Sequence, residues 1–110
     1  MAEPTLQQVF GANASQTATT LTIAKADLAS VGLTALASNT AESLMVGLLL
    51  KAAAYLKDSN QTTDPDIQVT IADSGFPQLV NRNSAQWRQI TYNVNLQTPD
   101  TGFAIDPDNY

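Results

Sequence analysis

The sequence predicts an α+β fold in which one long buried helix packs on an antiparallel sheet of three to five strands. Two observations predict this class. The segment 40–57 has helix-capping residues at its start and apolar side chains on more than one of its sides. Two later segments, 67–72 and 85–97, alternate apolar and polar residues as half-buried strands do. These patterns do not specify the order of the strands.

The length of the chain sets its expected domain organisation. A chain of 110 residues is most simply one domain. A compact monomer of 11.7 kDa exposes roughly 5,900 Å² of surface. The rest of the surface of the unfolded chain is buried on folding, which is enough for one hydrophobic core. We therefore expect a single domain over 1–110, with an N-terminal arm (a short helix and a loop) over 1–18 and an extended tail over 99–110.

The sequence of the first third of the chain predicts short helices, a strand and loops. A short helix is expected over 4–10, because proline suits its first position and glycine the position just past its end. A loop is expected over 11–18 and a strand over 19–25. The segment 26–38 is rich in small residues and predicts a short helical turn and then a loop, with Val31, Leu33 and Leu36 tucked inward.

The helix expected over 40–57 has a second apolar face, which must be covered by another part of the protein or by a partner. Asn39 is expected to cap it, with Glu42 at the capping-box spacing. Gly47 costs roughly 1 kcal/mol relative to alanine in a helix interior, a cost that close approach of another backbone would justify. Gly47 and Ala54 form a flat strip, and Leu50 extends the apolar surface. This face meets either another part of the same fold or another subunit.

The second half of the chain predicts strands separated by turns. A polar loop is expected over 58–66, before the first alternating strand. A turn over 73–75 is followed by a short strand over 76–80, which its proline places at a sheet edge. A second turn is expected over 81–84.

The strand expected over 85–97 has one apolar face and one face of amides, which include Asn93 and Asn95. The amide face is either solvated or reserved for a polar partner. Trp87 falls on this polar face. A bulge near Arg88 would return it to the core, and otherwise it is an exposed aromatic side chain of the kind that anchors interfaces.

The tail contains three apolar side chains that can anchor it, Phe103, Ile105 and Tyr110. We expect it to lie in an extended form on the domain or on a neighbour.

The composition excludes several classes of function. The chain has five basic and ten acidic side chains, a net charge of −5, and neither histidine nor cysteine. It therefore has no Ser-His-Asp triad, thiolate nucleophile, disulfide or zinc finger. The basic residues are scattered, which disfavours nucleic-acid binding. The longest apolar stretch, 44–50, is far below the roughly 20 residues of a membrane span. With no signal peptide visible, we expect a soluble cytoplasmic protein.

Two triplets, Asp73-Ser74-Gly75 and Asp100-Thr101-Gly102, match the Asp-Thr/Ser-Gly signature of aspartic proteases. That chemistry needs two carboxylates that share a proton. Small proteases of this type carry one triplet per chain, directly after a hydrophobic strand, whereas Gln97-Thr98-Pro99 precedes the second triplet here. The same triplet is also a common turn, and we interpret both as turns. A hydrolase is a remote alternative.

Two Asp-Pro-Asp segments, 64–66 and 106–108, offer carboxylates to a calcium ion. Calcium takes six to eight oxygen ligands, and neither segment has the spacing of an EF-hand loop. We interpret these acids as turn residues. No catalytic, cofactor-binding or metal-binding residue is assigned, and no cofactor is expected.

The leading hypothesis is a non-enzymatic structural or interaction subunit that forms a homo-oligomer. Only 15 of the 110 residues are charged, and a neutral polar surface is desolvated at lower cost than a charged one. The candidate interface residues are Gly47, Leu50, Ala54, Trp87, Asn93, Asn95 and Tyr110.

The composition is similar to that of small virion and phage-tail accessory proteins of bacteria and their prophages. This resemblance implies a virion-associated subunit with protein partners. The alternative is a small-molecule or peptide-binding module that uses the space between helix and sheet, lined by Tyr55, Trp87 and Tyr92.

Overall fold

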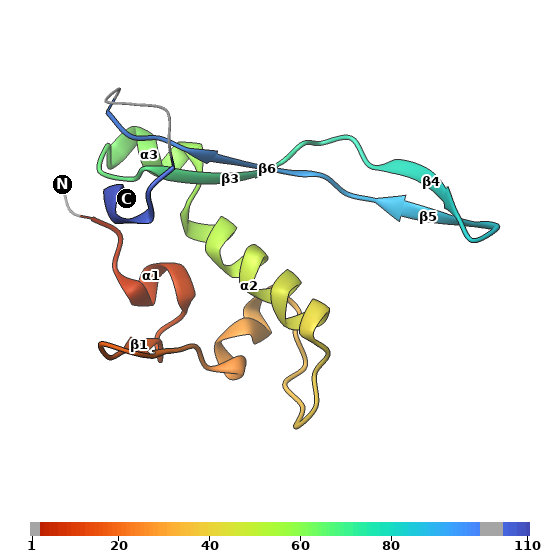
Figure 1. The fold of residues 1–110 in the computed structure, drawn as a ribbon, viewed down its shortest axis with the longest axis horizontal. Helices are drawn as coiled ribbons and strands as arrows, with labels where there is room; N and C mark the ends of the chain where they lie inside the picture. The colour runs from red at the N-terminus through yellow and green to blue at the C-terminus, as the bar shows by residue number, and fades with distance from the viewer. Residues whose placement is uncertain (1–2, 100–104) are drawn as a thin grey trace.

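The computed structural model describes residues 3–99 and 105–110, and it is an α+β structure with a short N-terminal helix, as expected (Figure 1). Its α-helices, strands and 3-10 helices (η) are α1 (Leu6–Phe10), β1 (Ser15–Gln16), β2 (Leu21–Thr22), η1 (Lys25–Val31), α2 (Ala41–Tyr55), α3 (Asp58–Thr63), β3 (Val69–Asp73), β4 (Gln78–Arg82), β5 (Ala85–Gln89), β6 (Tyr92–Leu96) and η2 (Pro107–Asn109). No helix within the described part of the chain is long and apolar enough to cross a membrane.

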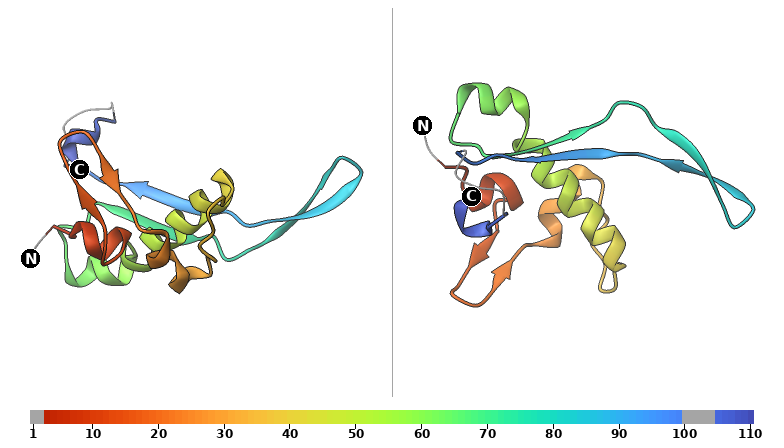
Figure 2. Two further views of the ribbon diagram at one scale, coloured as in Figure 1. Left: turned by 90° about the horizontal axis from the view of Figure 1, so that it is seen from below. Right: turned by 45° about the horizontal axis from the view of Figure 1, so that its top comes forward.

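The described strands pair two by two, and every pair is antiparallel: β1 with β2, β3 with β6, and β4 with β5. The described residues therefore do not form the expected sheet of three to five strands. The strand expected over 85–97 is divided at residues 90 and 91 into β5 and β6. Figure 2 shows the β3–β6 and β4–β5 pairs following one another along a single ribbon that leaves the body of the molecule.

A bulge separates the two halves of this ribbon. The Ser74 N–H donates to the Thr91 carbonyl at 2.9 Å, and Gln78 lies opposite Gln89. Residues 75–77 therefore face a single residue of the other strand, Ile90. Of the two alternatives for Trp87, a bulge near Arg88 that returns it to the core is not found among the described residues: the extra residues lie on the partner strand, where proline and glycine do not sustain a regular ladder.

The far end of the ribbon is a two-residue turn. Arg82 lies opposite Ala85, and the turn residues Asn83 and Ser84 have φ of 51° and 62°. Left-handed conformations at both positions are typical of the type I′ turn, whose twist matches that of a two-stranded ribbon. The turn expected over 81–84 is thus confined to its last two residues.

The hydrophobic core lies where α1, α2 and β3 meet. Val9, Ala52 and Ile71 form its buried centre. Half-buried side chains surround it: Phe10, Leu49, Ala53, Tyr55, Leu56, Val69 and Tyr92. The Ile71 N–H donates to the Leu56 carbonyl at 2.8 Å, which ties the outer edge of β3 to the end of α2.

The start of α2 differs from the prediction by one residue. Thr40, not Asn39, is the N-cap, and its hydroxyl accepts from the Ser43 N–H at 3.1 Å. The Asn39 amide instead closes the preceding loop, because Oδ1 accepts from the Leu36 N–H at 3.0 Å and Nδ2 donates to the Thr34 carbonyl at 2.9 Å. This closure leaves the Leu36 side chain exposed rather than tucked inward.

Two segments expected as irregular or extended also differ. Most of the polar loop expected over 58–66 is the helix α3, which starts after a break at the end of α2. The Asn60 side chain donates to the Tyr55 carbonyl at 2.8 Å and so links the two helices. The strand expected over 19–25 is reduced to β2, because it pairs only with the two residues of β1.

The described end of the tail is a turn of 3-10 helix rather than an extended strand. Gln68 Nε2 donates to the Asn109 carbonyl at 3.1 Å, which holds this turn beside the start of β3. Phe103, expected as an anchor, lies outside the described residues.

Candidate interaction surfaces

Residues 78–89, which we name the projecting hairpin, comprise β4, the turn and β5. Each of them is exposed except Val80, which is half-buried. The ribbon views show the projecting hairpin extending away from the helices (Figures 1 and 2). An isolated two-stranded hairpin is marginally stable at best in water. Among the residues that the structure describes, no third strand pairs with the projecting hairpin, which continues the β3–β6 pair.

The register sorts the side chains of the projecting hairpin onto two faces. Val80 lies opposite Trp87, and Leu79 lies opposite Arg88 on the other face. Trp87 Nε1 donates to the Arg82 carbonyl at 3.2 Å, and the Arg82 guanidinium carbon lies 4.3 Å from the centre of the indole ring. Each face thus combines a large apolar side chain with one arginine.

The apolar side chains of this region are open to solvent. Leu79 is 69% exposed and Trp87 is 46% exposed. At the bulge beside the projecting hairpin, Phe76 is 80% exposed and Ile90 is also exposed. Large apolar side chains are therefore exposed on both faces of the projecting hairpin, which is typical of a contact surface.

The projecting hairpin differs in charge from the rest of the chain. Arg82 and Arg88 are its only charged residues, so it carries +2. The whole chain carries −5, and the remainder of the chain therefore carries −7. A basic element projects from an acidic body.

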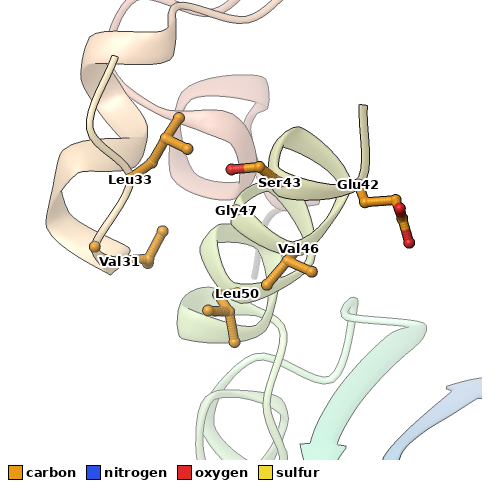
Figure 3. Close-up of a pocket in the computed structure, with 8 residues that line it drawn as sticks. Val31, Leu33, Glu42, Ser43, Val46, Gly47 and Leu50 are labelled. Atoms are coloured by element: carbon orange, nitrogen blue, oxygen red, sulfur yellow. The ribbon is translucent and has the colours of Figure 1, made fainter. Parts of the chain in front are cut away.

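A groove of about 330 Å³ lies between η1, the residues that follow it and the first half of α2 (Figure 3). Val31 and Leu33 line one side, and α2 supplies the other. The lining residues are Val31, Gly32, Leu33, Glu42, Ser43, Val46, Gly47 and Leu50. Val46 is 54% exposed at this groove. The groove is apolar along its length, with one carboxylate, Glu42, in the first turn of α2.

Gly47 lies buried at the base of this groove. A Cβ placed on Gly47 would lie 3.4 Å from Leu28 Cδ1 and 3.9 Å from Leu33 Cβ. Close approach at this glycine is therefore made by η1 and the loop after it, within one chain. On another side of α2, a smaller hollow of about 200 Å³ is lined by Ile23, Lys25, Leu28, Leu44 and Leu48.

The structure brings some of the candidate interface residues into these surfaces. Leu50 lines the groove, and Trp87 lies on the projecting hairpin. Ala54 is exposed near the end of α2, and Tyr110 is half-buried beside η2.

Asn93 and Asn95 lie on the face of β6 that turns away from the core. Both are exposed, and Asn95 Nδ2 donates to the buried hydroxyl of Thr70 at 3.5 Å. The amide face predicted from the sequence is thus present on β6, and its neighbour Thr70 is only 2% exposed.

The three aromatic residues expected to line a ligand site do not converge. Tyr55 and Tyr92 pack around the core, whereas Trp87 lies on the projecting hairpin. The grooves instead adjoin the first half of α2. Leu33, predicted to be tucked inward, is half-buried, but the groove that it forms with Val46 was not predicted, because the segment after η1 shows no periodicity to indicate where it packs.

The acidic turns have ordinary turn geometry. Asp73 Oδ1 accepts from the Gly75 N–H at 2.9 Å, Asp64 Oδ1 from the Asp66 N–H at 3.2 Å, and Asp106 Oδ1 from the Asp108 N–H at 3.0 Å. The second triplet, Asp100-Thr101-Gly102, lies outside the described residues. Among the residues that the structure describes, no three acidic side chains are grouped so that they could hold a metal ion.

The chain matches no protein-family model, no curated protein and no solved structure. The projecting hairpin and the groove are the features of the described chain that bear on its function.

Proposed function

We propose that this protein is a non-enzymatic structural subunit that associates with copies of itself. The projecting hairpin is the observation that supports the proposal. It exposes Leu79, Trp87 and their neighbours, and within the described residues its strands pair with no third strand. An assembled state would supply the missing partner.

The total surface of the chain supports the same proposal. The chain exposes 8068 Å², about 2,200 Å² more than the roughly 5,900 Å² of a compact monomer of this mass. A typical protein–protein interface takes about 800 Å² from each partner. The excess surface is thus large enough for two such contacts on each subunit.

The low charge lowers the free-energy cost of covering that surface. Fifteen of 110 residues are charged, so amides and hydroxyls supply much of the polarity. Burying these groups costs less than burying ions, provided that they find hydrogen-bond partners. We propose that the arrangement of a long buried helix on a sheet of three to five strands is completed between subunits.

The resemblance in composition to small virion and phage-tail accessory proteins extends the proposal. Such a subunit would be made in the cytoplasm and built into a larger particle, with proteins as its partners.

The test is the association state of the full chain. Sedimentation velocity over a hundredfold range of concentration is expected to show a discrete oligomer that dissociates on dilution. A single monomeric species at every concentration, together with no protein partner recovered by the tagged chain, would contradict the proposal.

A second candidate function, binding of a small apolar molecule or peptide, is favoured by the groove alone. Its 330 Å³ lies at the lower end of the roughly 300–1,000 Å³ of ligand sites. Titration of the chain with apolar fragments, followed by NMR, is expected to shift Val46 and Leu33 saturably if this function holds. Shifts scattered over the surface would contradict it.

A further inference from the structure

We propose that the projecting hairpin of one copy docks into the groove between η1 and α2 of the next copy, head to tail. The inference rests on the proposed self-association and names its two surfaces. Both are present on every copy. Figures 1 and 2 show the projecting hairpin extending away from the helices, and its side chains are exposed except Val80 in the part of the chain that the structure describes.

Charge selects this pairing over the contact of two hairpins. Two projecting hairpins would bring four arginines together without an acid, because each carries Arg82 and Arg88 alone. Like charges placed opposite one another are unfavourable. The rest of the next copy carries −7 as a whole; at its groove Glu42 is the one carboxylate in the lining, and Lys51, next to Leu50, donates to Ser30 Oγ of η1 at 3.3 Å. The basic hairpin is therefore attracted to the acidic remainder of another copy over a distance, and the apolar contact described next places it in the groove.

Apolar complementarity points to the same contact. Trp87 and Leu79 are exposed on opposite faces of the hairpin, so either face offers an apolar side chain to the groove, where Val46 is exposed. Aromatic anchors of this kind contribute most when they fill a hydrophobic pocket on the partner. Docking would lay the hairpin against a helix, which is the packing that a two-stranded ribbon needs for stability.

The proposed contact joins two different surfaces, so it is heterologous. Repetition of a heterologous contact builds a ring when the rotation closes and an open filament when it does not. Each subunit uses both surfaces, which agrees with an excess of exposed area sufficient for two contacts.

The experiment uses two full-length variants that each disable one surface. The groove variant is Val46→Asp, and its matched control is Met45→Asp, which adds the same charge one residue away, outside the groove. The hairpin variant is Leu79→Asp/Trp87→Asp, which places a carboxylate on each face. Its matched control is Leu21→Asp/Leu36→Asp, since both leucines are exposed and lie on neither surface.

The first readout is the association state of each variant, with circular dichroism to show that it is folded. The groove and hairpin variants are expected to be monomers at concentrations where the wild type and both controls assemble. The second readout is a mixture of the groove variant with the hairpin variant. One intact groove then meets one intact hairpin, so a dimer of one copy of each variant is expected, with no larger species.

Different results would overturn different claims. A groove variant that assembles like the wild type, or a mixture that stays monomeric, would refute head-to-tail docking and leave self-association in place. Saturable binding of a peptide or a small molecule to the groove, with assembly undisturbed, would refute it as well. A wild-type chain that is monomeric throughout would remove the proposed function along with the inference.

Discussion

Single residues near the N-terminus hold the first segment against η1. The Asp27 carboxylate accepts from the Asn13 backbone N–H at 2.8 Å and from its side-chain amide at 3.0 Å. The chain passes this carboxylate at Gly11, which has a φ of 115°. Close contact and left-handed backbone coincide there, so the position requires glycine.

Replacement of Gly11 by alanine should destabilise the fold. A Cβ at Gly11 would lie 2.5 Å from Asp27 Cβ, and the φ is strained for any other residue. Strain of this kind costs about 1–3 kcal/mol in the free energy of unfolding. The matched control is Gly32→Ala, where φ is 103° but nothing lies within 4 Å. Urea unfolding is expected to show a larger loss for Gly11→Ala, and equal losses would contradict the contact with Asp27.

Replacement of Gly47 by alanine is expected to affect stability differently from Gly11→Ala. Its added Cβ would make an ordinary contact with Leu28, at 3.4 Å, and α2 would gain helix propensity. Gly47→Ala is therefore expected to be neutral or to stabilise by up to about 1 kcal/mol. Gly47→Leu overfills the same space and should destabilise by about 1–3 kcal/mol. Thermal unfolding of both variants checks this, and a marked loss for Gly47→Ala would contradict it.

At the scale of elements, local signals predicted the helices better than the sheets. The α1 and α2 segments were predictable because their capping residues and apolar spacing are contained within a few turns of chain. The N-cap of α2 is Thr40 and not the predicted Asn39, because the side-chain oxygens of both residue types can accept from a backbone N–H in the first turn of a helix. The helix α3 was missed because its polar residues resemble those of a loop.

The sequence predicts which segments are strands, but it does not predict how deeply each strand is buried. Alternation in a segment indicates one apolar face and does not say what covers it. The segment with Tyr92 packs on the core, while the segment with Trp87 continues past the body of the molecule. The groove could not be predicted, because it depends on where the loop before α2 lies.

The turn of the projecting hairpin offers a test at this scale. Ser84 has a φ of 62°, and Asn-Gly is the preferred pair for a turn with two left-handed residues. Ser84→Gly is expected to stabilise the hairpin by about 1 kcal/mol, since relief of a left-handed side-chain residue is of that order. Hydrogen exchange at the amides of residues 78–89 should slow accordingly. Asn83→Ala should change exchange in the opposite direction, and identical rates in all three proteins would contradict the assigned turn.

At the scale of the whole molecule, the separation of a +2 hairpin from a −7 remainder predicts that assembly depends on salt. Raising NaCl from 0.01 M to 1 M shortens the Debye length from about 30 Å to about 3 Å. Exposed charge pairs contribute about 0.2–1 kcal/mol each, so one pair with Glu42, the single carboxylate of the groove, predicts a rise in the dissociation constant of about 1.4- to fivefold. Sedimentation equilibrium measures it. Tighter association at high salt would show that charge does not guide the contact.

The bulge at residues 75–77 has a consequence for symmetry. Extra residues on one strand bend a ribbon and increase its twist, so these three residues set the direction in which the projecting hairpin leaves the body. In a head-to-tail assembly that direction fixes the rotation from each subunit to the next. A longer or shorter bulge would then change the number of subunits in a ring, or the pitch of a filament, while both contact surfaces kept their affinity.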